Sequence, residues 1–165
     1  MIRDATPQDF AAILALNDAA VQFTSAMDAA RLQQLHAQAA YHRVVEVDAS
    51  VIAFLLALRE RAAYDSPNYQ WFQRSYSRFL YIDRIVVDAA ARGGGLGIQL
   101  YEDLFAFAAR THATRVTCEF DVDPPNPASE KFHARFGFRE VGRQRVGSSA
   151  KQVSLQLREI DDGTV

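Results

Sequence analysis

A run of glycines in the stretch AARGGGLGIQL, residues 90–100, is the feature of this sequence best suited to binding chemistry. It follows an apolar run that predicts a β-strand and precedes an apolar pattern that predicts a helix. The first turn of a helix leaves backbone N–H groups without intrahelical acceptors, and the helix dipole is positive there. The stretch therefore suggests a phosphate-binding turn, and the alternative is a loop without a ligand.

Two familiar phosphate-binding motifs do not fit this stretch. The P-loop needs Lys followed by Ser or Thr after its last glycine, and neither follows Gly97. The dinucleotide fingerprint G-x-G-x-x-G/A needs a small third residue, but that position holds Leu100 or Ile98, depending on the glycine chosen as the first.

The sequence gives little support for a disulfide, a nucleophilic cysteine or a metal site. The single cysteine, Cys118, excludes an internal disulfide and a multi-cysteine metal site, which fits a reducing compartment. A nucleophilic cysteine needs a positioned base and a lowered pKa, so the pattern favours a buried cysteine in a strand. His36 and His42 show no metal-ligand pattern, and we expect no metal.

Length and composition indicate one globular domain over residues 1–165, with 49% hydrophobic and 23% charged residues. Eighteen basic and twenty acidic residues give a net charge of -2, which leaves no broad basic field for nucleic acid. The N-terminal residues lack a signal-peptide pattern, and no apolar run approaches the roughly 20 residues of a membrane helix. We therefore expect neither nucleic acid nor membrane as a partner, and a cytoplasmic location.

Hydrophobic periodicity predicts alternating strands and helices. Strands are expected at residues 1–5, 43–47, 51–58, 80–87, 115–122, 139–144 and 152–158, and helices at residues 7–18, 28–40, 98–110 and 128–136. The strand, glycine turn, helix and strand from residue 80 onward form a βαβ crossover, which implies two parallel neighbours. The aromatic segment 59–79 interrupts the pattern, and a connection of this length is typically functional or partly helical.

Two motifs resemble those of the GNAT superfamily of acyl-CoA N-acyltransferases. The stretch RGGGLG, Arg92 to Gly97, resembles that family's [RQ]-x-x-G-x-[GA] pyrophosphate motif. The stretch NPASEKFHARFGFREVG, Asn126 to Gly142, resembles its N-x-x-[AS]-x-x-[FL]-[YH]-x-x-x-G-F element. The resemblance covers nearly the whole chain, although the first forty residues match only in layout. It implies a single-domain α/β fold with a mixed central sheet of six or seven strands, a splayed parallel pair and helices on both faces.

The resemblance also implies acetyl-CoA as the cosubstrate. In the family, strand backbone pairs with the pantetheine and thioester, while the glycine turn surrounds the pyrophosphate. The residues implied to contact the cofactor are Ile85, Val86, Val87, Arg92, Gly93, Gly94, Gly95, Leu96, Gly97, Asn126 and His133. The alternatives are that Arg92 lies in solvent and that Asn126 is only a helix cap.

Three side chains are candidates for acid-base catalysis in this setting. The acceptor amine must be neutral to attack a thioester, so the site needs a route for its proton. Asp83 is the first candidate base, because the family's acceptor meets the corresponding strand face, and Glu119 is the second. For each acid the alternative is an ion pair with an arginine. His133 stands where many relatives carry a tyrosine that protonates the leaving thiolate, and its alternative is a residue that merely contacts the cofactor.

The aromatic segment lies where relatives build the wall of the acceptor site. We expect Tyr64, Tyr69 and Trp71, with Tyr81 on the next strand, to contact the acceptor. The alternatives are a satellite core cluster and a dimer surface in a homodimer. The leading hypothesis is an N-acetyltransferase acting on a small-molecule amine. Its alternatives are a protein N-terminal or lysine acetyltransferase and a non-catalytic acyl-CoA-binding module.

Overall fold

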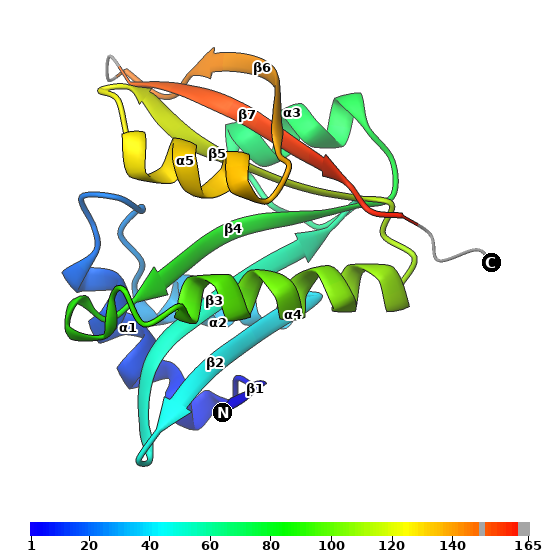
Figure 1. Cartoon of the computed structure of the whole chain (residues 1–165). Helices are drawn as coiled ribbons and strands as arrows, with labels where there is room; N and C mark the ends of the chain where they lie inside the picture. Colours follow the sequence, from blue (N-terminus) through cyan, green and yellow to red (C-terminus); the bar gives the residue numbers. More distant parts are fainter. Residues whose placement is uncertain (149–150, 162–165) are drawn as a thin grey trace. The chain divides into compact units, whose positions relative to one another are not determined.

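Strands and helices alternate along the chain in the computed structural model, which describes residues 1–148 and 151–161 (Figure 1). The strands are β1 (Ile2–Asp4), β2 (Tyr41–Val47), β3 (Ser50–Arg59), β4 (Phe79–Val87), β5 (Arg115–Asp123), β6 (Arg139–Arg145) and β7 (Gln152–Glu159). The helices are α1 (Phe10–Ala19), α2 (Ala29–Gln38), α3 (Pro67–Ser75), α4 (Leu96–Arg110) and α5 (Pro127–Arg135), with 3-10 turns η1 (Pro7–Asp9) and η2 (Ala89–Ala91). Across the described residues, none of the helices has the length and apolar character needed to cross a bilayer.

The strands form a seven-stranded mixed sheet in the order β1-β2-β3-β4-β5-β7-β6, and β4 and β5 are parallel. The predicted α/β fold with a mixed sheet and helices on both faces is therefore confirmed. The contacts divide the chain into two compact units, Met1–Leu58 with Ile82–Phe107 and Arg59–Tyr81 with Ala108–Val165. The strand β4 passes from the second unit into the first after Tyr81.

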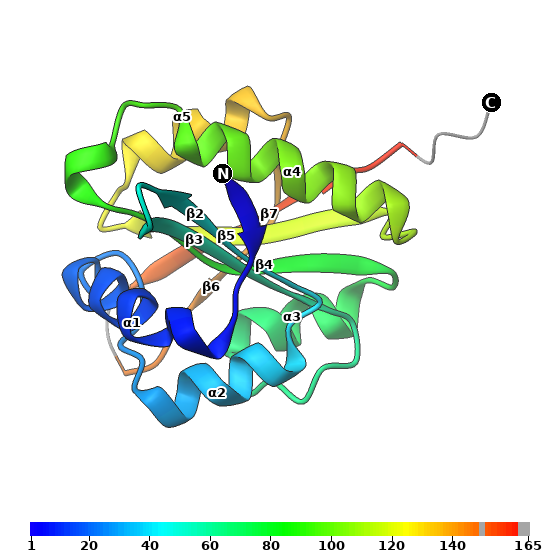
Figure 2. The ribbon, with the colours of Figure 1, turned by 90° about the horizontal axis from the view of Figure 1, so that it is seen from below.

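The first unit is built on β1, β2, β3 and the C-terminal part of β4. The β2–β3 hairpin turns at Asp48 and Ala49, which both have positive φ. The backbone N–H of Asp88 donates to the carbonyl of Ile52 at 2.8 Å, which ties the end of β4 to β3. Helix α4 covers one face of these strands, and α1 and α2 cover the other (Figure 2). Residues 53–58 of β3 are fully buried, as their unbroken apolar run predicts.

The second unit is built on the first residues of β4 with β5, β7 and β6. In the parallel pair, Phe79–Tyr81 lie beside Arg115–Thr117, and β7 pairs antiparallel with both β5 and β6. Helices α3 and α5 lie on opposite faces of these strands (Figure 2). Helix α3 lies within the aromatic segment 59–79 that interrupts the sequence pattern. Ser66 caps this helix and Pro67 begins it, while Tyr69 and Phe72 are fully buried.

A close contact in the second unit explains why β6 carries a glycine. A Cβ built on Gly142 would lie 2.6 Å from Cζ2 of Trp71. We expect Gly142→Ala to lower the free energy of unfolding by about 1–3 kcal/mol, because overpacking displaces the ring. Urea unfolding followed by far-UV circular dichroism measures the change and does not depend on the single tryptophan, Trp71. The same substitution in a Trp71→Phe background is the control, and an equal cost in both backgrounds would contradict this explanation.

A buried histidine makes the stability of the first unit sensitive to acid. His42 of β2 packs against Phe54, and its Nδ1 lies 2.8 Å from Nδ1 of His36. Burial, and then the charge of His36, lower the pKa of His42 from 6.5 to about 4, although Asp9 acts in the opposite direction. The folded protein therefore binds fewer protons than the unfolded chain between these pH values.

We expect His42 to reduce the free energy of unfolding by about 3 kcal/mol as the pH falls from 6.5 to 4, with no further loss below that. The measurement is urea unfolding at several pH values in the wild type and in His42→Phe, which keeps an aromatic ring but cannot titrate. The wild type should lose more stability on acidification than the variant. Parallel pH profiles in the two proteins would show that His42 does not cause the acid sensitivity.

Candidate functional site

The glycine turn lies in the first unit, between the end of β4 and the start of α4. Asp88 follows β4, and its carboxylate accepts from the N–H of Ala90 at 2.8 Å, which caps η2. The chain then passes through the glycines, and α4 begins at Leu96. The first N–H groups of α4 have no acceptor within the helix, so the turn presents backbone donors at the positive end of a helix dipole. This is the arrangement that binds phosphate groups.

The backbone conformation explains why this turn needs glycine. Gly93 and Gly95 have φ of +84° and +79°, values that L-residues rarely adopt. A Cβ on either residue would meet no atom within 4 Å, so packing does not require these glycines. The exposed Arg92 begins the turn, and its Nε lies 3.4 Å from the carbonyl of Val87. The turn thus keeps open space around donors that an anion can approach.

The helix that carries these donors is attached to β2 by a shared carboxylate. Oδ2 of Asp103 accepts from the hydroxyl of Tyr41 and from Nη1 of Arg43, both at 2.6 Å. The guanidinium of Arg43 also lies over the ring of Tyr41. Burial, and then this hydrogen bond, raise the pKa of Tyr41, so its hydroxyl remains a donor. Asp103 lies two turns after the start of α4 and therefore fixes the helix near its N-terminal end.

The predicted base Asp83 lies on β4 in the first unit and is ion-paired. Its Oδ2 accepts from Nε of Arg84 at 2.7 Å, and both side chains are almost completely buried. Nη1 of Arg84 donates to the Oδ1 of Asn17 at 2.9 Å and to the carbonyl of Ser25 at 3.0 Å. The ion pair is the alternative that the sequence left open for Asp83. Further along β4, Ile85 and Val87 are half-buried and Val86 is buried.

The second candidate base, Glu119, lies in the second unit with Tyr81. The hydroxyl of Tyr81 donates to Oε1 of Glu119 at 2.8 Å. Tyr81 pairs with Thr117 in the parallel ladder, and Glu119 follows two residues later on the same face of β5. The Tyr81 ring is buried, whereas Glu119 is half-buried. The hydroxyl of Tyr81 thus orients the carboxylate of Glu119.

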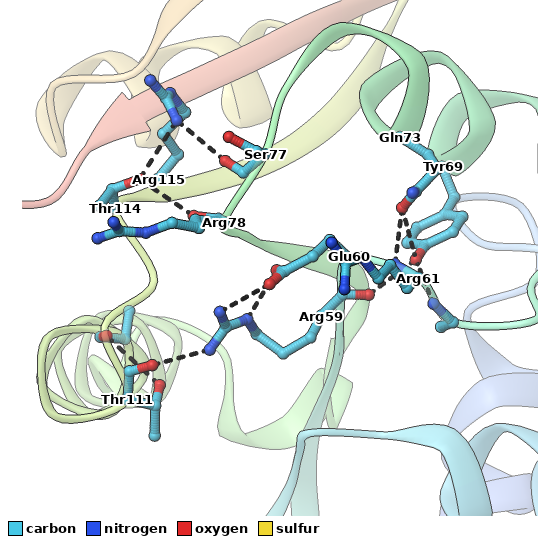
Figure 3. Close-up of polar contacts among 12 residues, drawn as sticks. Arg59, Glu60, Arg61, Tyr69, Gln73, Ser77, Arg78, Thr111, Thr114 and Arg115 are labelled. Carbon is cyan, nitrogen blue, oxygen red and sulfur yellow. Dashed lines mark hydrogen bonds and ion pairs between the residues drawn. The ribbon is translucent and has the colours of Figure 1, made fainter.

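The predicted acceptor contacts Tyr64 and Tyr69 pack with Tyr81 in a buried aromatic cluster of the second unit. Ring centroids lie 5.4 Å apart for Tyr64 and Tyr69, and 5.5 Å apart for Tyr69 and Tyr81. The hydroxyl of Tyr69 donates to the carbonyl of Arg59 and accepts from the N–H of Ala62 (Figure 3). Tyr69 is thus engaged by the backbone after β3, which matches the satellite core cluster that the sequence left open.

Figure 3 shows what surrounds this cluster at the starts of β4 and β5. Arg59 donates through Nε and Nη2 to the carboxylate of Glu60, and through Nη1 to the carbonyl of Thr111 at 2.9 Å. Nη1 of Arg115 donates to the carbonyl of Ser77 at 3.0 Å. These arginines satisfy carbonyl groups at the ends of helices and loops, so this part of the second unit has a structural role. Trp71 is half-buried, and its ring covers Gly142, as described above.

His133 of α5 is buried in the second unit and is neutral near pH 7. Its Nδ1 lies 2.7 Å from the carbonyl of Ser129, which can only accept, so Nδ1 carries the ring proton. The ring stacks on Phe120 at 5.4 Å and meets Phe138 edge-on. Burial lowers the pKa of His133 below 6.5. In this tautomer Nε2 accepts a proton, and it can donate one only after the ring has been protonated.

Two other predicted positions have structural roles in the second unit. The side chain of Asn126 accepts from the N–H of Ser129 at 3.2 Å and caps α5, which is the alternative that the sequence left open. Cys118 is buried on β5, and burial raises the pKa of its thiol, which keeps the thiol protonated. In the described ranges, 1–148 and 151–161, no three His, Cys, Asp or Glu side chains are arranged to hold a metal ion.

Asn17 and Ser25 are partners of Arg84 that were not predicted from the sequence. One signal could have found such partners: alternation along β4 places Arg84 on the buried face with Ile82 and Val86, and a buried guanidinium requires acceptors. No local pattern points to Asn17 or Ser25 themselves, because they lie 67 and 59 residues away in sequence.

Comparisons with known proteins match this architecture. The sequence model described as the acetyltransferase (GNAT) family matches residues 8–138. Phosphinothricin N-acetyltransferase of Streptomyces coelicolor is 41% identical over 61 residues, which span 37% of this chain and only 34% of that protein's length. Ard1 from Thermoplasma volcanium superposes with a TM-score of 0.80 at 20% identity over 97% of each chain. An N-acetyltransferase from Staphylococcus aureus superposes with a TM-score of 0.73 at 25% identity over 98% of each chain.

Proposed function

Because the chain belongs to the GNAT acetyltransferase family, we propose that it transfers an acetyl group from acetyl-CoA to the primary amine of a small molecule. The observation that carries this proposal is the glycine turn between β4 and α4, where two positive-φ glycines precede a helix start in open space. This turn suits a pyrophosphate, the negatively charged group that links the pantetheine arm of acetyl-CoA to its nucleotide.

We assign donor binding to the backbone of the first unit. The N–H groups of residues 93–97 would take the pyrophosphate, and Arg92 would add a charge-assisted hydrogen bond. The backbone of Ile85, Val86 and Val87 would pair with the pantetheine and thioester. An N–H aimed at the thioester oxygen would stabilise the charge that develops there during attack, which is the large electrostatic contribution in acyl transfer.

We assign the base to Glu119 ahead of Asp83. The amine nitrogen attacks the thioester carbonyl carbon, the C–N bond forms, the C–S bond breaks, and the proton of the amine must be taken up. The carboxylate of Asp83 already accepts a hydrogen bond from the buried guanidinium of Arg84, and both side chains are almost completely buried. Glu119 is half-buried and accepts a hydrogen bond from the hydroxyl of Tyr81, which orients its carboxylate.

His133 remains the predicted acid for the leaving thiolate. In the neutral ring the proton lies on Nδ1, which donates a hydrogen bond to the carbonyl of Ser129, so Nε2 can donate a proton only from the imidazolium form. Burial disfavours that form. If His133 is the acid, the rate of acetyl transfer should rise as the pH falls below 6.5. This rise should be absent in His133→Gln. A profile identical in both proteins would remove His133 from the proton transfer.

The small-molecule acceptor is supported by the relative named phosphinothricin N-acetyltransferase. Phosphinothricin, an amino acid with a free primary amine, is the acceptor in that protein's name and is the first probe for this chain. A protein acceptor is the competing choice within the family, and a peptide with a free N-terminal alanine represents it. Comparing the two probes separates these alternatives directly.

The test begins with the thermal midpoint of the purified protein with and without acetyl-CoA. A ligand that binds only the folded state adds about 2.7 kcal/mol at 100 times its dissociation constant. The second step follows release of the CoA thiol with phosphinothricin and with the peptide. A midpoint that rises, with thiol release that depends on phosphinothricin, supports the proposal. An unchanged midpoint would contradict acetyl-CoA binding, and release with the peptide alone would overturn the small-molecule acceptor.

A further inference from the structure

A buried tyrosine of the second unit belongs both to its aromatic core and to the candidate base. The ring of Tyr81 is 1% exposed, and its centroid lies 5.5 Å from that of Tyr69 and 5.9 Å from that of Phe72. The hydroxyl of the same side chain donates to Oε1 of Glu119 at 2.8 Å. The packing of the core and the direction of the carboxylate are therefore connected through one residue.

The two partners of this hydrogen bond differ in how firmly packing holds them. Tyr81 is fixed at its backbone, where it pairs with Thr117 in the parallel ladder, and its two side-chain torsions are restricted by the rings packed against it. Glu119 has three side-chain torsions and is half-buried, so packing restricts its carboxylate less. The rigid partner thus orients the flexible one.

Tyr69 of α3 is itself held by the backbone that follows β3 (Figure 3). Its hydroxyl donates to the carbonyl of Arg59 at 2.7 Å and accepts from the N–H of Ala62 at 2.8 Å. One turn later in α3, Oε1 of Gln73 accepts from the N–H of Arg61, also at 2.8 Å. Because Tyr69 is fully buried, its ring cannot shift without breaking these bonds.

We propose that Tyr81 is a positioning residue that sets the direction of the Glu119 carboxylate, and that Tyr69 holds Tyr81 in place from α3. This inference rests on the proposed function, because it takes Glu119 as the base. Tyr81 then acts on the reaction through Glu119 and not by contact with the amine. The burial of both tyrosine rings supports this role, since it leaves them almost no surface for an acceptor.

The test begins with Tyr81→Phe and Tyr69→Phe, which keep each ring and remove only its hydroxyl. Tyr76→Phe is the matched control, because it removes a hydroxyl from a half-buried tyrosine whose ring also contacts Phe72. We expect kcat to fall by about tenfold or more in Tyr81→Phe and severalfold in Tyr69→Phe, as misplaced catalytic groups cost rate. The amine KM and the midpoint shift with acetyl-CoA should stay close to those of the wild type, and Tyr76→Phe should match it throughout.

The decisive kinetic measurement repeats Tyr81→Phe in the Glu119→Gln background. A residue that acts only through Glu119 has no base left to position there, so the residual rate should change by about twofold or less. An equal loss of kcat in both backgrounds would show that Tyr81 acts independently of Glu119 and would overturn the proposal. A rise in the amine KM at constant kcat would overturn it as well, because it would indicate direct contact with the acceptor.

Crystal structures of the wild type and of Tyr81→Phe test the same geometry without turnover. We expect the contact of 2.8 Å in the wild type and a Glu119 carboxylate that is displaced, or present in more than one conformer, in Tyr81→Phe. A carboxylate in the same place in both proteins would contradict the positioning role. If the wild type acetylates neither amine, the proposed function fails, while these structures still decide whether Tyr81 orients Glu119.

Discussion

Gly97→Glu is expected to abolish acetyl-CoA binding while the protein stays folded. Gly97 lies in the first turn of α4 and does not belong to the positive-φ glycines, so a side chain there is compatible with the helix. A glutamate in a first helical turn is favourable by about 0.3–1 kcal/mol and replaces a residue with poor helix propensity. Its carboxylate would occupy the backbone donors and repel the pyrophosphate. At 100 times its dissociation constant, acetyl-CoA should add about 2.7 kcal/mol to the free energy of unfolding of the wild type. The resulting rise in the thermal midpoint should therefore be absent in Gly97→Glu.

Gln99→Glu is the matched control for this experiment. It adds the same charge to the same helix at an exposed position two residues later. We expect this variant to keep the shift with acetyl-CoA, apart from a modest reduction from long-range repulsion. Equal shifts in the wild type and in Gly97→Glu would show that the glycine turn does not hold the cofactor, and the donor assignment would have to be withdrawn.

Glu119→Gln is expected to lower kcat by about 100-fold to 10,000-fold, which is the usual contribution of a positioned general base. The amide keeps the size of the carboxylate and can still accept from the Tyr81 hydroxyl, so packing on β5 is preserved. The midpoint shift with acetyl-CoA should remain, because donor binding is assigned to the first unit. The measurement is the initial rate of thiol release with the acceptor that the wild type uses.

Two further variants test whether the loss of activity in Glu119→Gln is due to loss of the base or to the removal of a negative charge in general. Asp121→Asn makes the same chemical change two residues along β5 and should retain most of the activity. Asp83→Asn should lower kcat much less than Glu119→Gln, because Asp83 is ion-paired with Arg84. A large loss of kcat in Asp83→Asn, together with an active Glu119→Gln, would reverse the assignment of the base.

Much of the fold could be predicted because its signals are local. The apolar run of β3, the alternation in β4 and the helical spacing of α4 indicate their elements directly, and the structure has all three close to the predicted bounds. The predicted start of the second helix at residue 28 and the predicted cap at Asn126 also match the starts of α2 and α5. The predicted helix 7–18 differs at its start, where Thr6 and Asp9 form a capping box over η1 before α1 begins. For segment 59–79 the sequence predicts only a functional or partly helical connection, and the structure has helix α3 within it.

The amino-acid sequence by itself determined the glycine turn between β4 and α4, because the positive-φ glycines and the helix start are neighbours along the chain. Tertiary structure alone decided the state of the candidate catalytic side chains. Asp83 is paired with Arg84, whose other partners come from α1 and segment 20–28, and Glu119 meets Tyr81 across 38 residues of sequence. His133 is kept neutral by burial among aromatic rings. The protonation of a side chain depends on burial and on hydrogen bonds to residues that are distant in sequence. Neither can be predicted from the periodicity of the sequence.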